Sequence, residues 1–199
     1  MPLIEVRQLS AHTRMGLWRM DETPARLYAL YPHLQQLPMP YQNEGRQKEY
    51  LCVRALLAVM TGRENLLIDH LPSGKPVVEG YHVSISHTRG YAVLILSNAE
   101  NVAVDIEYRS DRVGRIAHKF IRPDEPCTTL DDMLLVWSAK ETLYKLHSDD
   151  NLDYFEMRSS AHHNGRIPVE NMKQQKVVSI SYEFTDDYVL TFTTEALPA

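Results

Sequence analysis

The sequence has only two cysteines, Cys52 and Cys127, and they do not form a CxxC pair. This disfavours both a disulfide scaffold and a cysteine-ligated zinc site, and a reducing, cytoplasmic location is expected. No apolar run approaches the roughly 18 residues that a membrane helix requires. The first residues, Met1-Pro2-Leu3-Ile4-Glu5, lack the basic and apolar regions of a secretory signal. We therefore expect neither a membrane association nor a leader.

The sequence also lacks a basic surplus. It carries 21 Lys and Arg against 26 Asp and Glu, for a net charge of −5. Proteins that bind nucleic acid without sequence preference usually have an excess of basic residues, so no nucleic-acid partner is expected. The charge is unevenly spread, with a balance of +2 in residues 1–99 and −7 in residues 100–199. This asymmetry allows a basic pocket in one half and an acidic one in the other.

The 199 residues, with 44% hydrophobic and 24% charged, suit one domain or two small lobes of a globular protein. Alternating and helical periodicities predict an α+β fold. Asp21 is the expected cap of the first helix, and Gly62 is expected to end the second. We predict strands at 3–7, 13–20, 81–86, 91–96, 102–107, 177–184 and 188–193, and helices at 24–31, 44–61, 113–120 and 130–146.

A short internal echo favours two related halves. The stretch Val83-Ser84-Ile85-Ser86 recurs as Val178-Ser179-Ile180-Ser181, about half a chain later. Each copy precedes a turn and an apolar strand that begins with tyrosine. Such strand sequences are common by chance, so the echo alone leaves a repeat and a coincidence open. A repeat predicts two similar lobes, 1–100 and 101–199, each a small antiparallel sheet packed with helices, with a ligand site at their interface.

Two carboxylates share one face of the predicted strand 102–107. Because strand residues alternate, Asp105 and Glu107 lie on the same side as Ala103. A solvent-facing strand surface explains this pattern. Taken alone, the pattern favours that explanation, and the alternative is a hard cation such as Mg2+, which binds carboxylate oxygens and keeps several waters.

The predicted helix 130–146 has a stripe that changes character along its length. Its positions are Leu130, Leu134, Trp137, Glu141 and Lys145. The stripe begins apolar and should face the core, yet it ends in two charges, which are rarely buried unless paired or bound. An exposed Glu–Lys pair at i,i+4 is one explanation. A third metal carboxylate at Glu141 with a phosphate-binding Lys145 is the other.

Two weaker features precede these. Ser84-Ile85-Ser86-His87 ends a strand on a histidine, and Gly74-Lys75-Pro76 presents a lysine in a turn. Each is common without a function, and the P-loop spacing is absent.

In this order and spacing, GKP, SxSH, VDIE and WSAKETLYK resemble the 4′-phosphopantetheinyl transferase superfamily. The resemblance spans residues 74–145. It is closest to the longer, single-chain, two-lobed type, the surfactin-synthetase-activating type. It implies Mg2+-dependent transfer of the phosphopantetheine arm of coenzyme A to a serine of an apo acyl or peptidyl carrier protein, with release of adenosine 3′,5′-bisphosphate. A monomer would suffice for this activity.

The resemblance also assigns roles to residues. Asp105, Glu107 and Glu141 would hold Mg2+, and Lys145 would bind the phosphate. Glu125, in Phe120-Ile121-Arg122-Pro123-Asp124-Glu125, would be the catalytic base, although an N-terminal charge ahead of the next helix is the simpler explanation. The coenzyme A contacts implied are Arg46, Arg54, Lys75, Pro76, Ser86, His87 and Lys140.

A basic helical face would recognise the carrier. Arg112, Arg115, Lys119 and Arg122 recur at helical spacing, and acidic carriers would be attracted to them. Three departures from the family pattern are Ala103 in place of a glycine, the glycine-free segment after Lys145, and the lack of an arginine shortly before GKP. A degenerate binder, a metal-dependent phosphohydrolase and a plain interaction domain remain the alternatives.

Overall fold

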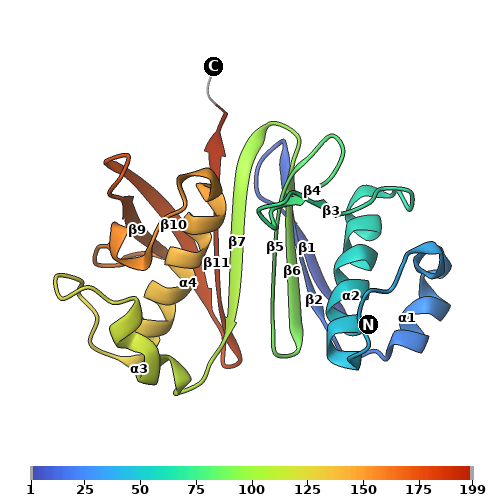
Figure 1. Cartoon of the computed structure of the whole chain (residues 1–199), viewed down its shortest axis with the longest axis horizontal. Helices are drawn as coiled ribbons and strands as arrows, with labels where there is room; N and C mark the ends of the chain where they lie inside the picture. Colours follow the sequence, from blue (N-terminus) through green and yellow to red (C-terminus); the bar gives the residue numbers. More distant parts are fainter. Residues whose placement is uncertain (1, 198–199) are drawn as a thin grey trace. The chain divides into compact units, whose positions relative to one another are not determined.

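The computed structural model describes residues 2–197. These residues form two compact units, one running through Asn101 and including the chain again from Ala196, and one spanning Val102–Glu195 (Figure 1). Both units combine antiparallel strands with helices, so the predicted α+β class is confirmed. Residues 198 and 199 of the expected second lobe lie outside the described residues.

The first unit has a four-stranded antiparallel sheet in the order β1-β2-β6-β5. One helix, α2, packs on it through Leu51, Leu56 and Leu57, which are fully buried with Trp18 of β2. The elements are β1 (Leu3–Gln8), β2 (Thr13–Arg19), α1 (Pro24–Leu30), α2 (Glu44–Thr61), β3 (Asp69–His70), β4 (Pro76–Val77), β5 (His82–Thr88) and β6 (Tyr91–Ser97), with a 3-10 turn at Pro32–Gln36.

Helix α2 has the predicted bounds. Asn43 caps it by accepting a hydrogen bond from the Arg46 N–H at 3.2 Å. Gly62 ends it with φ of 69°, a left-handed conformation that costs glycine little. The cap predicted for α1 is wrong, because Thr23 rather than Asp21 accepts the Arg26 N–H. Asp21 instead pairs with Arg19.

The second unit has a five-stranded sheet in the order β7-β11-β10-β9-β8, and α4 packs against β9 and β10. Its elements are β7 (Glu100–Tyr108), α3 (Arg112–Ile116), α4 (Leu130–Leu146), β8 (Met157–Ser159), β9 (Arg166–Asn171), β10 (Lys176–Phe184) and β11 (Tyr188–Ala196), with 3-10 turns η2 (Ala117–Lys119), η3 (Ser148–Asp150) and η4 (Tyr154–Glu156). Strands β8 and β9, which the sequence analysis did not predict, extend this sheet.

The helix predicted over 113–120 is wrong in extent. Residues 112–116 form α3, and residues 117–119 form a separate 3-10 turn. Gly114, a poor helix former, packs so tightly that an added Cβ would lie 2.8 Å from the Leu130 side chain.

The echoed sequences both occupy the first strand of an antiparallel hairpin, β5–β6 and β10–β11. The strand orders of the two sheets differ, however, and the second sheet has one strand more. The two units therefore share this hairpin but not the strand order of the whole sheet. No helix among the described residues is long and apolar enough to cross a membrane.

Candidate functional site

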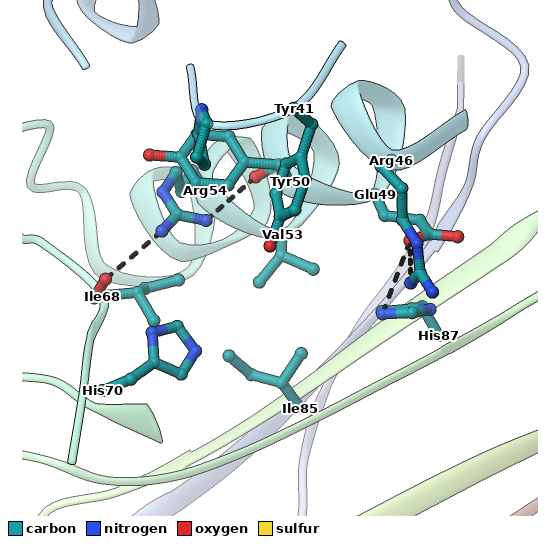
Figure 2. A pocket seen from close by; sticks show the side chains of 11 residues that line it. Tyr41, Arg46, Glu49, Tyr50, Val53, Arg54, Ile68, His70, Ile85 and His87 are labelled. Carbon is teal, nitrogen blue, oxygen red and sulfur yellow. Dashed lines mark hydrogen bonds and ion pairs between the residues drawn. The ribbon is translucent and has the colours of Figure 1, made fainter. Parts of the chain in front are cut away.

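The first unit contains a pocket of about 230 Å³ beside α2 (Figure 2). Arg46, Arg54 and His87 line it, so three predicted coenzyme A contacts are brought to one place. Helix α2 supplies the two arginines, and β5 supplies the histidine. Figure 2 shows Arg46 and His87 at one side of the pocket and Arg54 at the other.

Glu49 organises the side of the pocket that holds Arg46 and His87. The Arg46 guanidinium donates to the Glu49 carboxylate at 2.8 Å, and the His87 Nε2 lies 3.6 Å from the same oxygen. One carboxylate therefore faces the Arg46 guanidinium and the His87 imidazole. An anionic ligand that reached these groups would have to compete with Glu49 for them.

Arg54 is held rigidly on the other side. Its guanidinium stacks 3.4 Å from the Tyr50 ring centroid and donates to the Tyr50 and Ile68 carbonyls at 3.2 and 3.3 Å. Burial lowers the pKa of Arg54, and the neighbouring Tyr50 opposes that shift. This arrangement fixes a planar cation at the pocket wall, where a phosphate or a stacked base would meet it.

The other predicted contacts from this unit lie elsewhere. Pro76 pairs in register with His70, a residue that lines the pocket, and Lys75 precedes it in the β3–β4 connection. Ser86 is buried in β5, where alternation puts it on the opposite face from Ile85 and His87, which both line the pocket. Pro76 therefore pairs with a residue that lines the pocket, but Lys75, Pro76 and Ser86 are not themselves among the lining residues.

In the second unit, Asp105 of β7 faces α4. It is buried, and it accepts hydrogen bonds from the Ser138 hydroxyl at 2.8 Å and the Lys145 ammonium at 2.7 Å. Lys145 also donates to the Val104 carbonyl at 3.1 Å, while its side chain stays 26% exposed. The predicted metal carboxylate and the predicted phosphate lysine are thus direct partners.

Glu107 and Glu141 complete the acidic cluster, and each accepts one hydrogen bond from an aromatic side chain. The Trp137 indole N–H donates to Glu107 at 2.8 Å, and the Tyr154 hydroxyl donates to Glu141. Burial, together with the Asp105 and Glu141 charges, raises the pKa of Glu107 to about 7. Burial also raises the pKa of Glu141, with a contribution from Asp105. The three carboxylates are close enough to repel one another.

This donor set fits a hard divalent cation by its chemistry. Three carboxylates that disfavour one another's charged forms would be stabilised by Mg2+, which prefers oxygen ligands. Within residues 2–197, however, no group of three or more His, Cys, Asp or Glu side chains is arranged to hold a metal ion. The carboxylates therefore match Mg2+ in charge and ligand type but are not arranged to bind it, and their side chains are held by Lys145, Trp137 and Tyr154.

The shifted pKa of Glu107 predicts a pH dependence of stability. Between pH 4.5 and about 7, folded Glu107 keeps a proton that the unfolded chain has released. The stabilisation that protonated Glu107 adds to the free energy of unfolding should therefore be fully present below pH 4.5. It should fall as the pH rises to about 7, by up to roughly 1.4 kcal/mol per unit. Denaturant unfolding at pH 5 and 8 of the wild type and Glu107→Gln should isolate this contribution.

The control for this experiment is Asp186→Asn, which removes an exposed carboxylate from the same unit. It should keep the pH dependence of the wild type. If Glu107→Gln also kept it, Glu107 would not carry the raised pKa.

The predicted base Glu125 is buried as a structural ion pair. Its side chain and that of Lys140 have no exposed surface, and the Lys140 ammonium lies 2.8 Å from its carboxylate. The carboxylate also accepts the Arg122 and Ser159 backbone N–H groups, both at 2.7 Å. A general base must reach the proton that it removes. Burial denies Glu125 that reach, so we do not retain it as the base.

Lys140 is likewise buried and has no exposed surface with which to bind a phosphate group. Its ammonium donates to the Phe120 carbonyl at 2.7 Å and the Tyr154 carbonyl at 3.1 Å, besides Glu125. Burial lowers the pKa of Lys140, while the pairing with Glu125 opposes that shift. We therefore remove Lys140 from the predicted coenzyme A contacts.

The basic face predicted for the carrier is only partly present. Arg112, Arg115 and Lys119 are exposed on α3 and the 3-10 turn that follows. Arg122 lies beyond that turn, where it pairs with Asp124 at 2.9 Å and donates to the Phe155 carbonyl. The four residues therefore do not form one helical stripe.

Residues 101–193 match the family model described as the 4′-phosphopantetheinyl transferase superfamily. This region is similar to that superfamily. The match contains Asp105, Glu107, Glu141 and Lys145, so the acidic cluster lies within the matched region. It begins after the pocket of the first unit. No curated protein matches the chain.

Several residues around the acidic cluster and the pocket were not indicated by the sequence patterns. Tyr154 and Ser138 donate to the carboxylates, and Glu49 pairs with the pocket cations. Tyr154 lies 13 residues from Glu141, so no helical or strand period connects them. A signal did exist for Tyr50, because an aromatic residue at i and an arginine at i+4 share one helix face.

Proposed function

We propose that this chain transfers the 4′-phosphopantetheine arm of coenzyme A to a serine of an apo acyl or peptidyl carrier protein. The reaction would depend on Mg2+ and release adenosine 3′,5′-bisphosphate. Phosphopantetheine transfer is the general activity of the matched superfamily. The observation that carries the proposal is the cluster of Asp105, Glu107, Glu141 and Lys145 inside the matched region.

The cluster has the parts that such a transfer needs. Asp105, Glu107 and Glu141 would hold Mg2+, which would neutralise the charge that develops on the pyrophosphate. An ammonium has three N–H donors, and Lys145 gives two of them to Asp105 and the Val104 carbonyl. Its remaining donor and its exposure suit it to bind a phosphate oxygen and stabilise the leaving group.

The first unit would supply the nucleotide contacts. Arg54, Arg46 and His87 give the pocket its cations, and Tyr50 and Tyr41 give it aromatic surface. Lys75 would add a further charge. This grouping supports the longer, single-chain type, in which residues 1–100 bind coenzyme A and residues 101–199 hold the metal. Such a chain would act as a monomer.

The carrier would meet the exposed basic residues of the second unit. Arg112, Arg115 and Lys119 form the part of the predicted face that the structure keeps exposed. An acidic carrier would be steered to them by charge, with an effect that salt weakens.

An intact-mass assay tests the transfer directly. The protein is mixed with coenzyme A, Mg2+ and an apo carrier, with a chelator in a parallel sample. A mass gain of one phosphopantetheine that disappears with chelator is expected. Hydrolysis of a phosphoester without any carrier modification would instead support the phosphohydrolase alternative. Coenzyme A binding without transfer to fatty-acid, polyketide or peptide carriers would support a degenerate binder.

A substitution of His87 tests the nucleotide pocket. His87→Ala should raise the KM for coenzyme A by roughly 10- to 150-fold, because a charge-assisted bond to phosphate contributes about 1.5–3 kcal/mol. The KM for 3′-dephospho-coenzyme A should change little if His87 binds the 3′-phosphate. His163→Ala, which removes an exposed histidine of the second unit, is the matched control. An equal rise for both substrates would exclude His87 from the 3′-phosphate.

A further inference from the structure

The pocket of the first unit has two sides that differ in their balance of charge (Figure 2). On one side, Arg54 donates its hydrogen bonds to two backbone carbonyls. On the other side, Arg46 and His87 both lie against one oxygen of the Glu49 carboxylate, at 2.8 and 3.6 Å. Glu49 is the one acidic side chain among the described residues that line the pocket. An anion that approached Arg46 and His87 would therefore meet a carboxylate already bound to them.

Helix α2 places Glu49 at this position. Arg46, Glu49 and Val53 follow one another at spacings of three and four residues, so they share the face of the helix that lines the pocket. His87 reaches the same carboxylate from β5, which lies much later in the chain. Two separate elements therefore meet at Glu49.

Stability does not account for this carboxylate. The side chains of Arg46, Glu49 and His87 are 59%, 24% and 37% exposed. Ion pairs at such exposure contribute little to stability, because water solvates both charges and the paired side chains lose conformational freedom. The larger effect of Glu49 should therefore be on ligands.

A phosphate and Glu49 compete for the same two side chains. Phosphate binds guanidinium and imidazole groups through charge-assisted hydrogen bonds, as a carboxylate does. It must either displace Glu49 or bind beside a like charge, and both reduce its affinity. A ligand without a phosphate at this side leaves the contacts of Glu49 with Arg46 and His87 intact. Glu49 therefore weakens the binding of the phosphorylated ligand selectively.

We propose that Glu49 is a specificity-determining residue that occupies the place of a phosphate beside Arg46 and His87 and so narrows the preference for coenzyme A over 3′-dephospho-coenzyme A. The inference rests on the proposed function, which brings the 3′-phosphate of coenzyme A to His87. Glu49 keeps Arg46 and His87 paired until that phosphate displaces it. Removal of the Glu49 charge should therefore make the pocket more selective for the phosphorylated form.

The test measures binding rather than transfer. Coenzyme A and 3′-dephospho-coenzyme A are titrated into the full chain by calorimetry at pH 7 and low salt, without a carrier. Glu49→Gln keeps the length of the side chain and removes its charge. It should tighten coenzyme A binding by roughly fivefold or more, because like charges that compete for the same partners repel each other. The affinity for 3′-dephospho-coenzyme A should change by less than about twofold, since only exposed contacts are altered.

Glu44→Gln is the matched control, because it removes a carboxylate from the same helix but outside the pocket lining. It should bind both ligands like the wild type, which separates the effect of Glu49 from that of net charge. Glu49→Asp draws the carboxylate back by one methylene and should give an intermediate preference. It keeps the inference testable if Glu49→Gln fails to fold, which thermal unfolding of each variant reports.

The outcomes separate this inference from the proposed function. If Glu49→Gln binds coenzyme A no more tightly than the wild type, while the wild type transfers phosphopantetheine, the inference is wrong and the function stands. If both ligands bind more tightly by the same factor, Glu49 does not act on the 3′-phosphate and the inference is wrong. A wild type and variants that bind neither ligand overturn the inference and the nucleotide pocket together. The expected gain for coenzyme A alone, without transfer to any carrier, supports the inference and contradicts the proposed transfer.

Discussion

The Glu141→Gln variant should lose phosphopantetheine transfer by at least about a hundredfold while it stays folded. An amide keeps the oxygen that accepts the Tyr154 hydrogen bond, so the local packing should survive. It removes the negative charge that we propose for the cation, and stabilisation of developing charge is typically the largest contribution to such a reaction. The rate of carrier modification, followed by intact mass at saturating coenzyme A, measures the effect.

Asp149→Asn is the control for this experiment. Asp149 is an exposed carboxylate shortly after α4, and its neutralisation should leave the rate unchanged. Addition of Mg2+ should raise the thermal midpoint of the wild type and of Asp149→Asn but not that of Glu141→Gln. Transfer at the wild-type rate by Glu141→Gln would rule out Glu141 as a metal ligand.

Lys140→Met should lower the free energy of unfolding by about 3–5 kcal/mol, because it leaves Glu125 charged and buried without a counter-ion. The Phe120 and Tyr154 carbonyls would lose their donor at the same time. Most changes at exposed positions alter stability by less than about 0.5 kcal/mol. Denaturant unfolding at pH 7 should therefore show a clear displacement of the midpoint.

A double variant distinguishes the ion pair from simple loss of packing. Glu125→Gln in the Lys140→Met background removes the remaining buried charge and should restore much of the lost stability. Lys119→Met, at an exposed lysine, should change little. If Lys140→Met stayed as stable as the wild type but lost coenzyme A affinity, Lys140 would be a phosphate ligand after all.

Helix α4 connects the two predictions, because it carries a structural residue next to a functional one. Lys140 points into the core and fixes Phe120, Tyr154 and Glu125, while Glu141 belongs to the acidic cluster. Consecutive helix residues point about 100° apart, so one helix serves both purposes. The buried pair should therefore affect the cluster indirectly, through Tyr154.

The roles of Glu125 and Lys140 illustrate what sequence patterns do not reveal. Both residues fit the family motif, and both carry charges that ordinarily face solvent. Their pairing joins positions 15 residues apart across an irregular segment, which no helical or strand period relates. The placement of Ser86, in contrast, could be predicted from the sequence. Neighbouring strand residues point to opposite faces of the sheet, so Ser86 and His87 could not both face the pocket.

The local structure was largely determined by the sequence itself. Helices 44–61 and 130–146 have the predicted bounds, since periodicity and caps are properties of neighbouring residues. The same holds for the shared face of Asp105 and Glu107, which follows from strand alternation. The motif order was also sufficient to indicate the superfamily. The segment 113–120 was mispredicted, because α3 ends at Ile116 and residues 117–119 form a 3-10 turn.

Only the tertiary structure decided which charges meet. In the folded chain Lys145 pairs with Asp105, and Lys140 is buried with Glu125. Tyr154 donates a hydrogen bond to Glu141, and Trp137 donates one to Glu107. It also gathered Arg46, Arg54 and His87 around one pocket. These contacts join residues that are distant in the chain, and their energies depend on burial and on partners. Sequence spacing therefore identifies the residue types of this site, and packing determines what each residue does.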